Sequence, residues 1–195
     1  MFIELTDHLR CPNEHDESFL VLLPGTMEGR SVLTGDLGCP VCGRTFQLAN
    51  GVFDTGDAPA TTVANSVLDA DAITTLVGLH GPGGYLTLVG APAALWSEVA
   101  ELNPGVALVA VNPPSQVSDG PGVSVLRSSR LPIKSGSMRG VVLGRPFADD
   151  SAWVKEAARV VLSGLRVVGE GKEPPSDIIG LLATAGGVWV GTKKR

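Results

Sequence analysis

The spacing of hydrophobic residues differs between the start of the chain and the remainder. In residues 18–23, 30–34 and 45–53, short runs of strand-forming residues are separated by glycine, proline and polar residues. The pair Asn50-Gly51, which lies between apolar residues, is typical of a two-residue hairpin turn. These features predict a small β-rich domain over residues 1–56.

From residue 66 onward the pattern predicts helices that alternate with buried strands. Apolar residues recur at helical spacing over residues 67–79, and Gly81-Pro-Gly-Gly84 is expected to end that helix. The nearly continuous apolar runs 85–89 and 106–111 predict strands covered on both faces, with a helix over residues 92–102 between them. Strand, helix and strand in this order form the βαβ unit of a parallel sheet.

The C-terminal half continues this alternation. Further strands are predicted at residues 122–126, 140–144, 165–168 and 188–191. Two more helices are expected: one from a cap at Asp150 or Ser151 through Leu162, with Gly164 as terminator, and one over residues 176–185, ended by Gly186-Gly187. The expected fold class is α/β, a small β-domain followed by a Rossmann-like, doubly wound domain over residues 66–195.

A linker is predicted between these two domains. Residues 54–65 are rich in Gly, Ala, Thr, Pro and Asp and show no apolar period, and we assign the linker to residues 57–65.

Composition excludes several classes of protein. A chain of 195 residues with 44% apolar residues can bury a substantial core. The net charge of −5 gives no general attraction to nucleic acid, and the only basic run is Lys193-Lys194-Arg195. No apolar run reaches the roughly 18 residues that span a bilayer. Because the N-terminus lacks the pattern of a secretory signal, a cytoplasmic location without membrane contact is expected.

The three cysteines lie close together in two short motifs. These are Cys11-Pro-Asn-Glu-His15 and Cys39-Pro-Val-Cys42-Gly43. Donors that arrive in two pairs suit tetrahedral zinc, because each pair can occupy one edge of the tetrahedron. In the second motif, Gly43 permits the left-handed turn that points backbone N–H groups at sulfur. We therefore predict a structural zinc site formed by Cys11, His15, Cys39 and Cys42.

Alternatives to this ligand set remain open. His8, three residues before Cys11, competes as the fourth ligand, although His15 follows a Cys-Pro turn just as Cys42 does. Free cysteines in an ordinary core are a second alternative, which the paired spacing disfavours. Disulfides are disfavoured because an odd number of cysteines leaves one thiol unpaired.

The order of these motifs resembles a known family. LRCP at residues 9–12, a hairpin, and GCPVCGRTFQLANGVFD at residues 38–54 are similar to the small zinc-ribbon proteins that partner and activate tRNA and rRNA methyltransferases. They are also similar to zinc ribbons fused to some rRNA guanine methyltransferases. The resemblance implies a zinc ribbon and a protein partner. In that family the first motif usually ends in cysteine, where this chain has His15.

A second resemblance covers most of residues 66–195. LTLVG at residues 86–90, VALVAVN at 106–112, RLPIKSGSMRGVVL at 130–143 and EAARVVLSGLRVV at 156–168 are similar to segments of class I S-adenosylmethionine-dependent methyltransferases. This resemblance implies S-adenosylmethionine as cofactor, with Gly90 and Asn112 at two cofactor-binding positions.

Several polar residues of that family are missing here. Leu88 stands where the family has an acidic residue, Ala91-Pro92-Ala93 replaces the glycine-rich loop, and Asn112 replaces the carboxylate that holds the ribose hydroxyls. Arg139 stands at a further aspartate position. Together these changes predict that this chain has lost the polar contacts that bind the cofactor.

The remaining motifs predict no catalytic residue. Asn112-Pro113-Pro114 resembles the NPP motif of amino-methylating enzymes, but it follows the second strand of the α/β domain and not the fourth. Gly81-Pro-Gly-Gly84 precedes a strand, so it lacks the geometry of a phosphate loop. Once the zinc ligands are assigned, no Ser/His/Asp or Cys/His constellation is left.

Two functions follow from this sequence. The preferred one is a zinc-binding, methyltransferase-like pseudoenzyme that serves as a binding or scaffolding module for a protein partner. The alternative is an active S-adenosylmethionine-dependent methyltransferase with an atypical pocket that acts on RNA or a small molecule.

Overall fold

The computed structural model describes residues 1–60 and 65–194 of the chain. The N-terminal part consists of the 3-10 helix η1 (Ile3–His8) and the strands β1 (Val21–Pro24), β2 (Met27–Glu28), β3 (Ser31–Val32), β4 (Gly35–Gly38), β5 (Thr45–Ala49) and β6 (Val52–Asp54). The rest consists of α1 (Ala70–Val77), β7 (Tyr85–Val89), η2 (Ala91–Leu95), α2 (Trp96–Leu102), β8 (Ala107–Val111), β9 (Val123–Arg127), β10 (Met138–Leu143), η3 (Phe147–Asp149), α3 (Ser151–Val160), β11 (Val161–Glu170), β12 (Ile179–Ala185) and β13 (Val188–Lys193).

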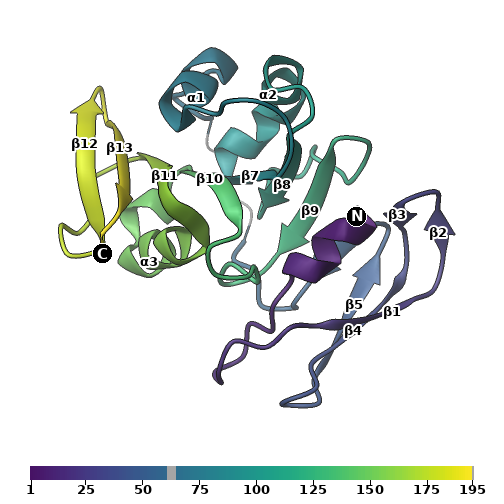
Figure 1. Cartoon of the computed structure of the whole chain (residues 1–195). Helices are drawn as coiled ribbons and strands as arrows, with labels where there is room; N and C mark the ends of the chain where they lie inside the picture. Colours follow the sequence, from purple (N-terminus) through teal and green to yellow (C-terminus); the bar gives the residue numbers. More distant parts are fainter. Residues whose placement is uncertain (61–64, 195) are drawn as a thin grey trace.

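One large sheet runs through the molecule (Figure 1). Among the described residues its order is β1-β4-β5-β6-β9-β8-β7-β10-β11-β13-β12, and β2 pairs separately with β3. The strands β9, β8, β7, β10 and β11 are parallel, and the strand order reverses at β7. This is the order of a doubly wound, Rossmann-like domain, as predicted. The α/β fold class is therefore confirmed.

Helices cover both faces of the parallel strands (Figure 1). On one face, α1 and α2 bury Ile73, Val77 and Val99 against the sheet. On the other, α3 buries Trp153 and Val154 in a core that also includes the N-terminal part of the chain. The sheet interior is thus shielded on both sides, which explains why its strands are almost uniformly apolar.

We call the N-terminal part of the chain, from η1 to β6, the N-terminal module. It extends the parallel sheet. Strand β6 pairs in parallel with β9, so that Phe53 lies beside Leu126. Within the module, Asn50 and Gly51 adopt left-handed φ angles of 52° and 75° and join β5 to β6, which confirms the predicted hairpin turn. The core around α3 is continuous with the module's core, because both belong to one cluster of buried side chains.

The predicted helix over residues 176–185 is wrong. These residues include strand β12, which runs antiparallel to β13. Gly186 and Gly187 have φ angles of 59° and 77°. Two successive left-handed residues form the turn that matches the twist of a hairpin, so they join two strands here and do not end a helix.

Two other helices end earlier than predicted. Helix α1 ends at Val77, because Gly78 adopts a left-handed φ of 67° and donates its N–H to Thr74 O. Helix α3 begins after the cap Asp150, as expected, but ends at Val160, and residues 161–170 form β11.

The predicted linker, residues 57–65, includes residues 61–64, which lie outside the described residues. At its start, Asp57 accepts hydrogen bonds from the Ser129 hydroxyl at 2.6 Å and from Thr55. Among the described residues, no helix is long and apolar enough to cross a membrane.

Candidate metal centre

The four predicted metal ligands lie together at the tip of the N-terminal module. The donor atoms of Cys11, His15, Cys39 and Cys42 all lie within 4.8 Å of one another. Cys11 Sγ is 3.8 Å from Cys42 Sγ, and Cys39 Sγ is 3.4 Å from His15 Nε2. A tetrahedral zinc ion with ordinary bond lengths requires about 3.8 Å between two sulfurs and about 3.5 Å between sulfur and nitrogen. These two donor pairs therefore have the spacing of a tetrahedral site, and the remaining pairs lie within 4.8 Å.

Backbone hydrogen bonds build both motifs. Gly43, with a φ of 70°, donates its N–H to Cys39 O at 3.0 Å, and Cys39 donates to Arg44 O at 2.9 Å. The loop of the first motif is closed by Cys11, whose N–H donates to Ser18 O at 3.0 Å. Each pair of donors is thus presented by a closed loop, as the Cys-Pro spacing indicated.

The ring orientation of His15 suits a metal ligand. Its Nδ1 lies 2.7 Å from Asp16 O. A carbonyl oxygen can only accept, so Nδ1 carries the proton and Nε2 keeps a free lone pair toward Cys39. The rival His8 lies elsewhere, with its ring edge-on to Tyr85 at 5.1 Å, and does not belong to the group of donors.

The thiols differ in acidity. The backbone N–H of Arg44 points at the sulfur of Cys42 and lowers its pKa to about 6, and the side chain of Asn13 adds to this effect. Burial raises the pKa of Cys11 to about 12, and the neighbouring sulfurs of Cys39 and Cys42 add to that rise. Three thiolates this close repel one another unless a cation lies among them. Zinc binding here should therefore release protons.

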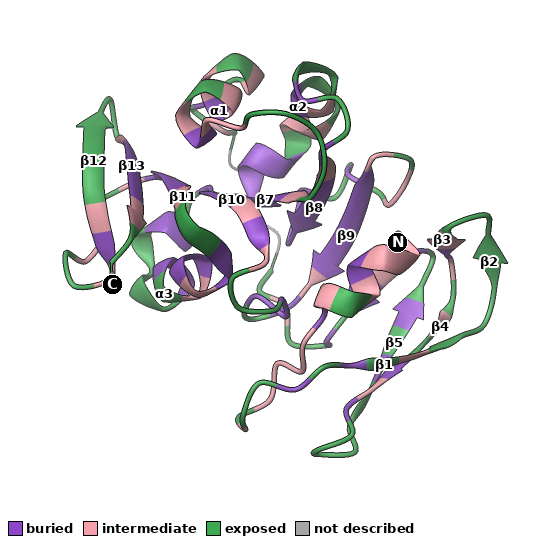
Figure 2. Ribbon diagram, in the orientation of Figure 1, coloured by how far each residue is buried: buried purple, intermediate pink, exposed green. Residues whose placement is uncertain are grey.

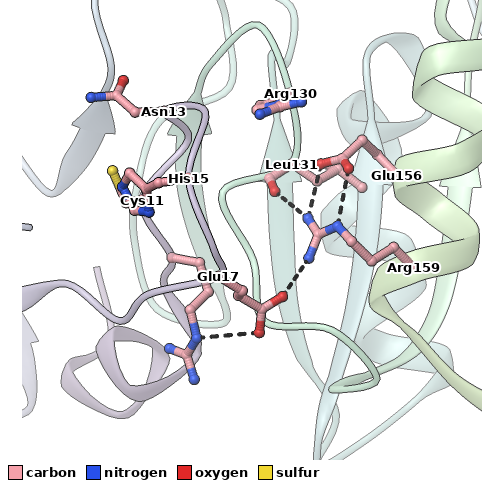
Figure 3. A pocket seen from close by; sticks show the side chains of 9 residues that line it. Cys11, Asn13, His15, Glu17, Arg130, Leu131, Glu156 and Arg159 are labelled. Carbon is pink, nitrogen blue, oxygen red and sulfur yellow. Dashed lines mark hydrogen bonds and ion pairs between the residues drawn. The ribbon is translucent and has the colours of Figure 1, made fainter. Parts of the chain in front are cut away.

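The loop that carries the first candidate motif, residues 11–18, lies against the α/β domain (Figure 3). Arg159, on α3, donates to Glu17 Oε2 at 3.0 Å, and its guanidinium also binds Glu156 at 2.8 Å. Arg130 donates to Pro12 O at 2.9 Å. A depression of about 250 Å³ remains between the loop and α3, and these four charged side chains are among those that line it. Arg159 and Arg130 thus hold the loop to the α/β domain.

The predicted cofactor position at Gly90 is packed by an aromatic ring. Gly90 follows β7 with a φ of 72°, and a Cβ at this position would lie 2.8 Å from a ring carbon of Phe147. Phe147 is buried and meets Trp153 in a T-shaped contact at 4.6 Å. On the neighbouring strand, Gly144 follows β10 and is packed in the same way against Pro92. In doubly wound folds this switch point between strands is where ligands bind.

The second predicted cofactor residue, Asn112, faces the protein backbone. Its Nδ2 donates to Ser128 O at 2.7 Å, and its Oδ1 accepts from Ser128 N at 3.0 Å. The side chain is 5% exposed. The hydrogen bonds of the Asn112 side chain therefore join the end of β8 to the loop after β9. Gly90 and Asn112 both lie at the carboxyl ends of adjacent strands, as predicted, but their contacts are internal.

Comparisons with known proteins give structural likeness alone. No protein-family model and no curated protein matches the chain. A methyltransferase of an antibiotic biosynthesis pathway from Anabaena variabilis is 21% identical, with a TM-score of 0.43 over 51% of this chain and 43% of that one. An S-adenosylmethionine-dependent methyltransferase from Aquifex aeolicus is 13% identical, with a TM-score of 0.45 over 64% and 88%.

A complex of the Trm112 methyltransferase activator with a methyltransferase from Haloferax volcanii also matches, at 15% identity and a TM-score of 0.38 over 46% of this chain and 45% of that one. The chain spans less than half the length of the Anabaena and Haloferax structures.

Proposed function

We propose that the protein is a zinc-binding, methyltransferase-like pseudoenzyme that serves as a binding or scaffolding module for a protein partner. In this proposal residues 1–56 form a zinc ribbon and residues 66–195 form the methyltransferase-type domain. The observation that carries the proposal is a contrast. The four thiol and imidazole donors lie within 4.8 Å of one another, and two of the pairs have distances that suit a tetrahedral metal ion, whereas Gly90 at the switch point is packed under Phe147.

The zinc ion has a structural role in this proposal. Four protein donors complete a tetrahedron, so no position is left for a water or substrate. The ion would hold the Cys11–His15 loop to the Cys39–Cys42 loop. These two loops are otherwise joined by few polar contacts, among them the Asn13 amide donating to Cys42 Sγ at 3.3 Å.

S-adenosylmethionine does not fit the residues at the expected cofactor positions. The glycine that should let the backbone approach the cofactor instead makes room for Phe147. Asn112 carries no charge, and both its polar side-chain atoms face Ser128. Leu88, at the family's acidic position, is fully buried. We therefore assign no catalytic step to this chain.

Calorimetric titration of the zinc-loaded full chain with S-adenosylmethionine and S-adenosylhomocysteine tests the proposal. We expect no binding at millimolar ligand. Micromolar affinity for either compound would overturn the non-catalytic assignment in favour of an active methyltransferase. Elemental analysis of the same sample tests the metal separately, because freshly purified protein without zinc would remove the zinc ribbon from the proposal whatever the titration shows.

A further inference from the structure

Exposed apolar side chains are concentrated in the N-terminal module. Of the ten large apolar side chains that are exposed in the described chain, five lie within residues 19–41. They are Phe19, Val21, Leu23, Met27 and Val41. Single exposed apolar residues are ordinary, but a cluster on a small module indicates a contact surface.

Three of these residues form a continuous ridge. Phe19, Val21 and Leu23 alternate along β1 and the residues before it, so their side chains leave the same face of the sheet. Their exposed fractions are 56%, 44% and 67%. The intervening Leu20 and Leu22 turn toward the module's core. We call Phe19, Val21 and Leu23 the β1 ridge.

The ridge lies on a strand with a free edge. β1 is an edge strand of the large sheet (Figure 1), and in the described part of the chain only β4 pairs with residues 21–24. Phe19, which precedes the strand, pairs with Arg10 in an isolated bridge, so the free edge is that of residues 21–24. Most residues of β1 are exposed (Figure 2). An edge strand with open backbone groups and alternating apolar side chains is the surface to which an extended peptide adds as a further strand.

Acidic residues outnumber basic ones in the segment that carries the ridge. Residues 10–44 contain five acidic residues and three basic residues, Arg10, Arg30 and Arg44, and Arg10 lies 3.6 Å from Glu17. Arg30 is already paired with Glu4, and Glu17 is paired with Arg159. The other four acidic residues, Glu14, Asp16, Glu28 and Asp36, are exposed, and Asp36 lies directly beside Leu23 in the β1–β4 ladder. A zinc ion bound by three thiolates and a neutral imidazole would carry a net charge of about −1 in the same module.

This charge decides between two occupants of the free edge. A second copy of the chain would bring two acidic rims together, and like charges across paired strands are destabilising. A segment with basic residues on either side of its apolar residues would complement both the apolar β1 ridge and the acidic residues near it.

We propose that the β1 ridge binds an extended segment of a partner protein. The segment adds as a strand to β1, and its alternating apolar side chains are flanked by lysine or arginine. This inference rests on the proposed scaffolding function, for which it names the class of partner.

Two synthetic peptides test it with the zinc-loaded full chain. The first is Lys-Lys-Ile-Thr-Val-Thr-Ile-Lys-Lys, and the second has Glu at all four Lys positions. By fluorescence anisotropy at low salt, the lysine peptide should bind at least about tenfold more tightly, and added salt should reduce the difference. Absence of binding, or equal affinity for both peptides, would overturn the proposal. Sedimentation that shows a dimer of the chain abolished by Leu23→Ser would assign the edge to a second copy instead.

Variants place the peptide on the ridge. Phe19→Ser and Leu23→Ser should each weaken binding of the lysine peptide by about tenfold or more, whereas Leu102→Ser, which alters a side chain that is 45% exposed on α2, should leave it unchanged. A variant that fails to fold would also lose peptide binding, so hydrogen exchange in the unaltered protein provides a second measurement. The amides of residues 21–23 should exchange more slowly with peptide bound, and unchanged exchange there contradicts the proposal.

A parallel titration of the same samples with S-adenosylmethionine separates the two proposals. Peptide binding together with cofactor binding would keep the ridge and overturn the non-catalytic assignment. If neither the lysine peptide nor S-adenosylmethionine binds, the ridge proposal is overturned and the non-catalytic assignment stands.

Discussion

The guanidinium of Arg159 donates to the carboxylate of Glu17 at 3.0 Å and so joins helix α3 to the candidate metal-binding loop, residues 11–18, across 142 residues of sequence. The same guanidinium donates to the carbonyl oxygens of Leu131 and Ile133 at 2.8 and 2.7 Å. Glu17 in turn accepts from Ser135 N at 3.1 Å. One side chain therefore organises the contact between the candidate metal centre and the α/β domain.

Replacing Arg159 with alanine should lower the free energy of unfolding by about 1–3 kcal/mol. The change removes one donor from each of two carboxylates and two carbonyl oxygens, and the remaining donors to Glu17 and partial solvent exposure limit the cost. Urea denaturation measures the effect. Lys155→Ala, an exposed change on the same helix, serves as the control and should leave the stability within about 0.5 kcal/mol. Equal stabilities of the two variants would show that the Arg159 contacts contribute nothing.

The cysteine variants should lose the metal. We expect about one zinc ion per chain by elemental analysis, and much less in Cys39→Ser or Cys42→Ser. Because one buried cluster joins the module to α3, loss of zinc should also lower the stability of the remaining fold. Hydrogen exchange would show this as faster exchange in the module first and in α3 second. Full zinc occupancy in both variants would contradict the assigned ligands.

The two candidate histidines give a matched pair. His15→Gln should reduce zinc affinity, because it removes the Nε2 that lies 3.4 Å from Cys39 Sγ. His8→Gln should retain the metal, because His8 packs against Tyr85 and lies outside the group of donors. Competition with a chromogenic chelator measures both affinities. The opposite ranking would make His8 the fourth ligand.

Local spacing accounts for what the sequence predicted well. The two Cys-Pro motifs and the Asn50-Gly51 turn each depend on a few adjacent residues, and the all-apolar runs around residues 85–89 and 106–111 are typical of strands covered on both faces. The structure brings the four donors of the Cys-Pro motifs together and forms the turn and both strands at the predicted positions.

Long-range contacts have no such local signal. The parallel pairing of β6 with β9 and the contact between Glu17 and Arg159 join segments far apart in the chain. Residues 176–185 were ambiguous for a different reason, because a short apolar run before two glycines fits both a helix end and a hairpin. The packing of Phe147 on Gly90 also has no local sequence signal, since a glycine after a strand is compatible with a bound cofactor or with a packed aromatic side chain.

Acid should weaken the contact between Asp57 and the loop after β9. Burial acts to raise the pKa of Asp57, but the hydrogen bonds from Ser129 and Thr55 outweigh it and hold the pKa below its ordinary value of 3.8. A depressed folded-state pKa contributes stability above the unfolded value, and that contribution is lost as pH falls through the folded-state pKa.

Asp57→Asn should therefore lower stability at pH 7, by less than about 1 kcal/mol because the group is exposed. The difference from the unaltered protein should shrink below about pH 5 and vanish well under pH 3.8. Urea denaturation at a series of pH values measures it, with the exposed change Glu101→Gln as control. A difference that is constant with pH would show that the carboxylate charge plays no part.

The packing of Phe147 on Gly90 can be tested by a double-mutant cycle. Phe147→Ala should cost about 3–5 kcal/mol, because it empties a buried site. Gly90→Ala should also destabilise, since the added methyl group meets the ring and the residue keeps a φ of 72°. In the double variant the clash is absent, so its cost should be smaller than the sum of the two single costs. Additive costs would show that the ring does not limit the space at Gly90.

The Phe147→Ala variant also tests cofactor binding. Although the change opens space at Gly90, the variant should not bind S-adenosylmethionine, because Leu88 and Asn112 still provide no carboxylate for the cofactor. A micromolar affinity in this variant would show that the ring alone had closed the site.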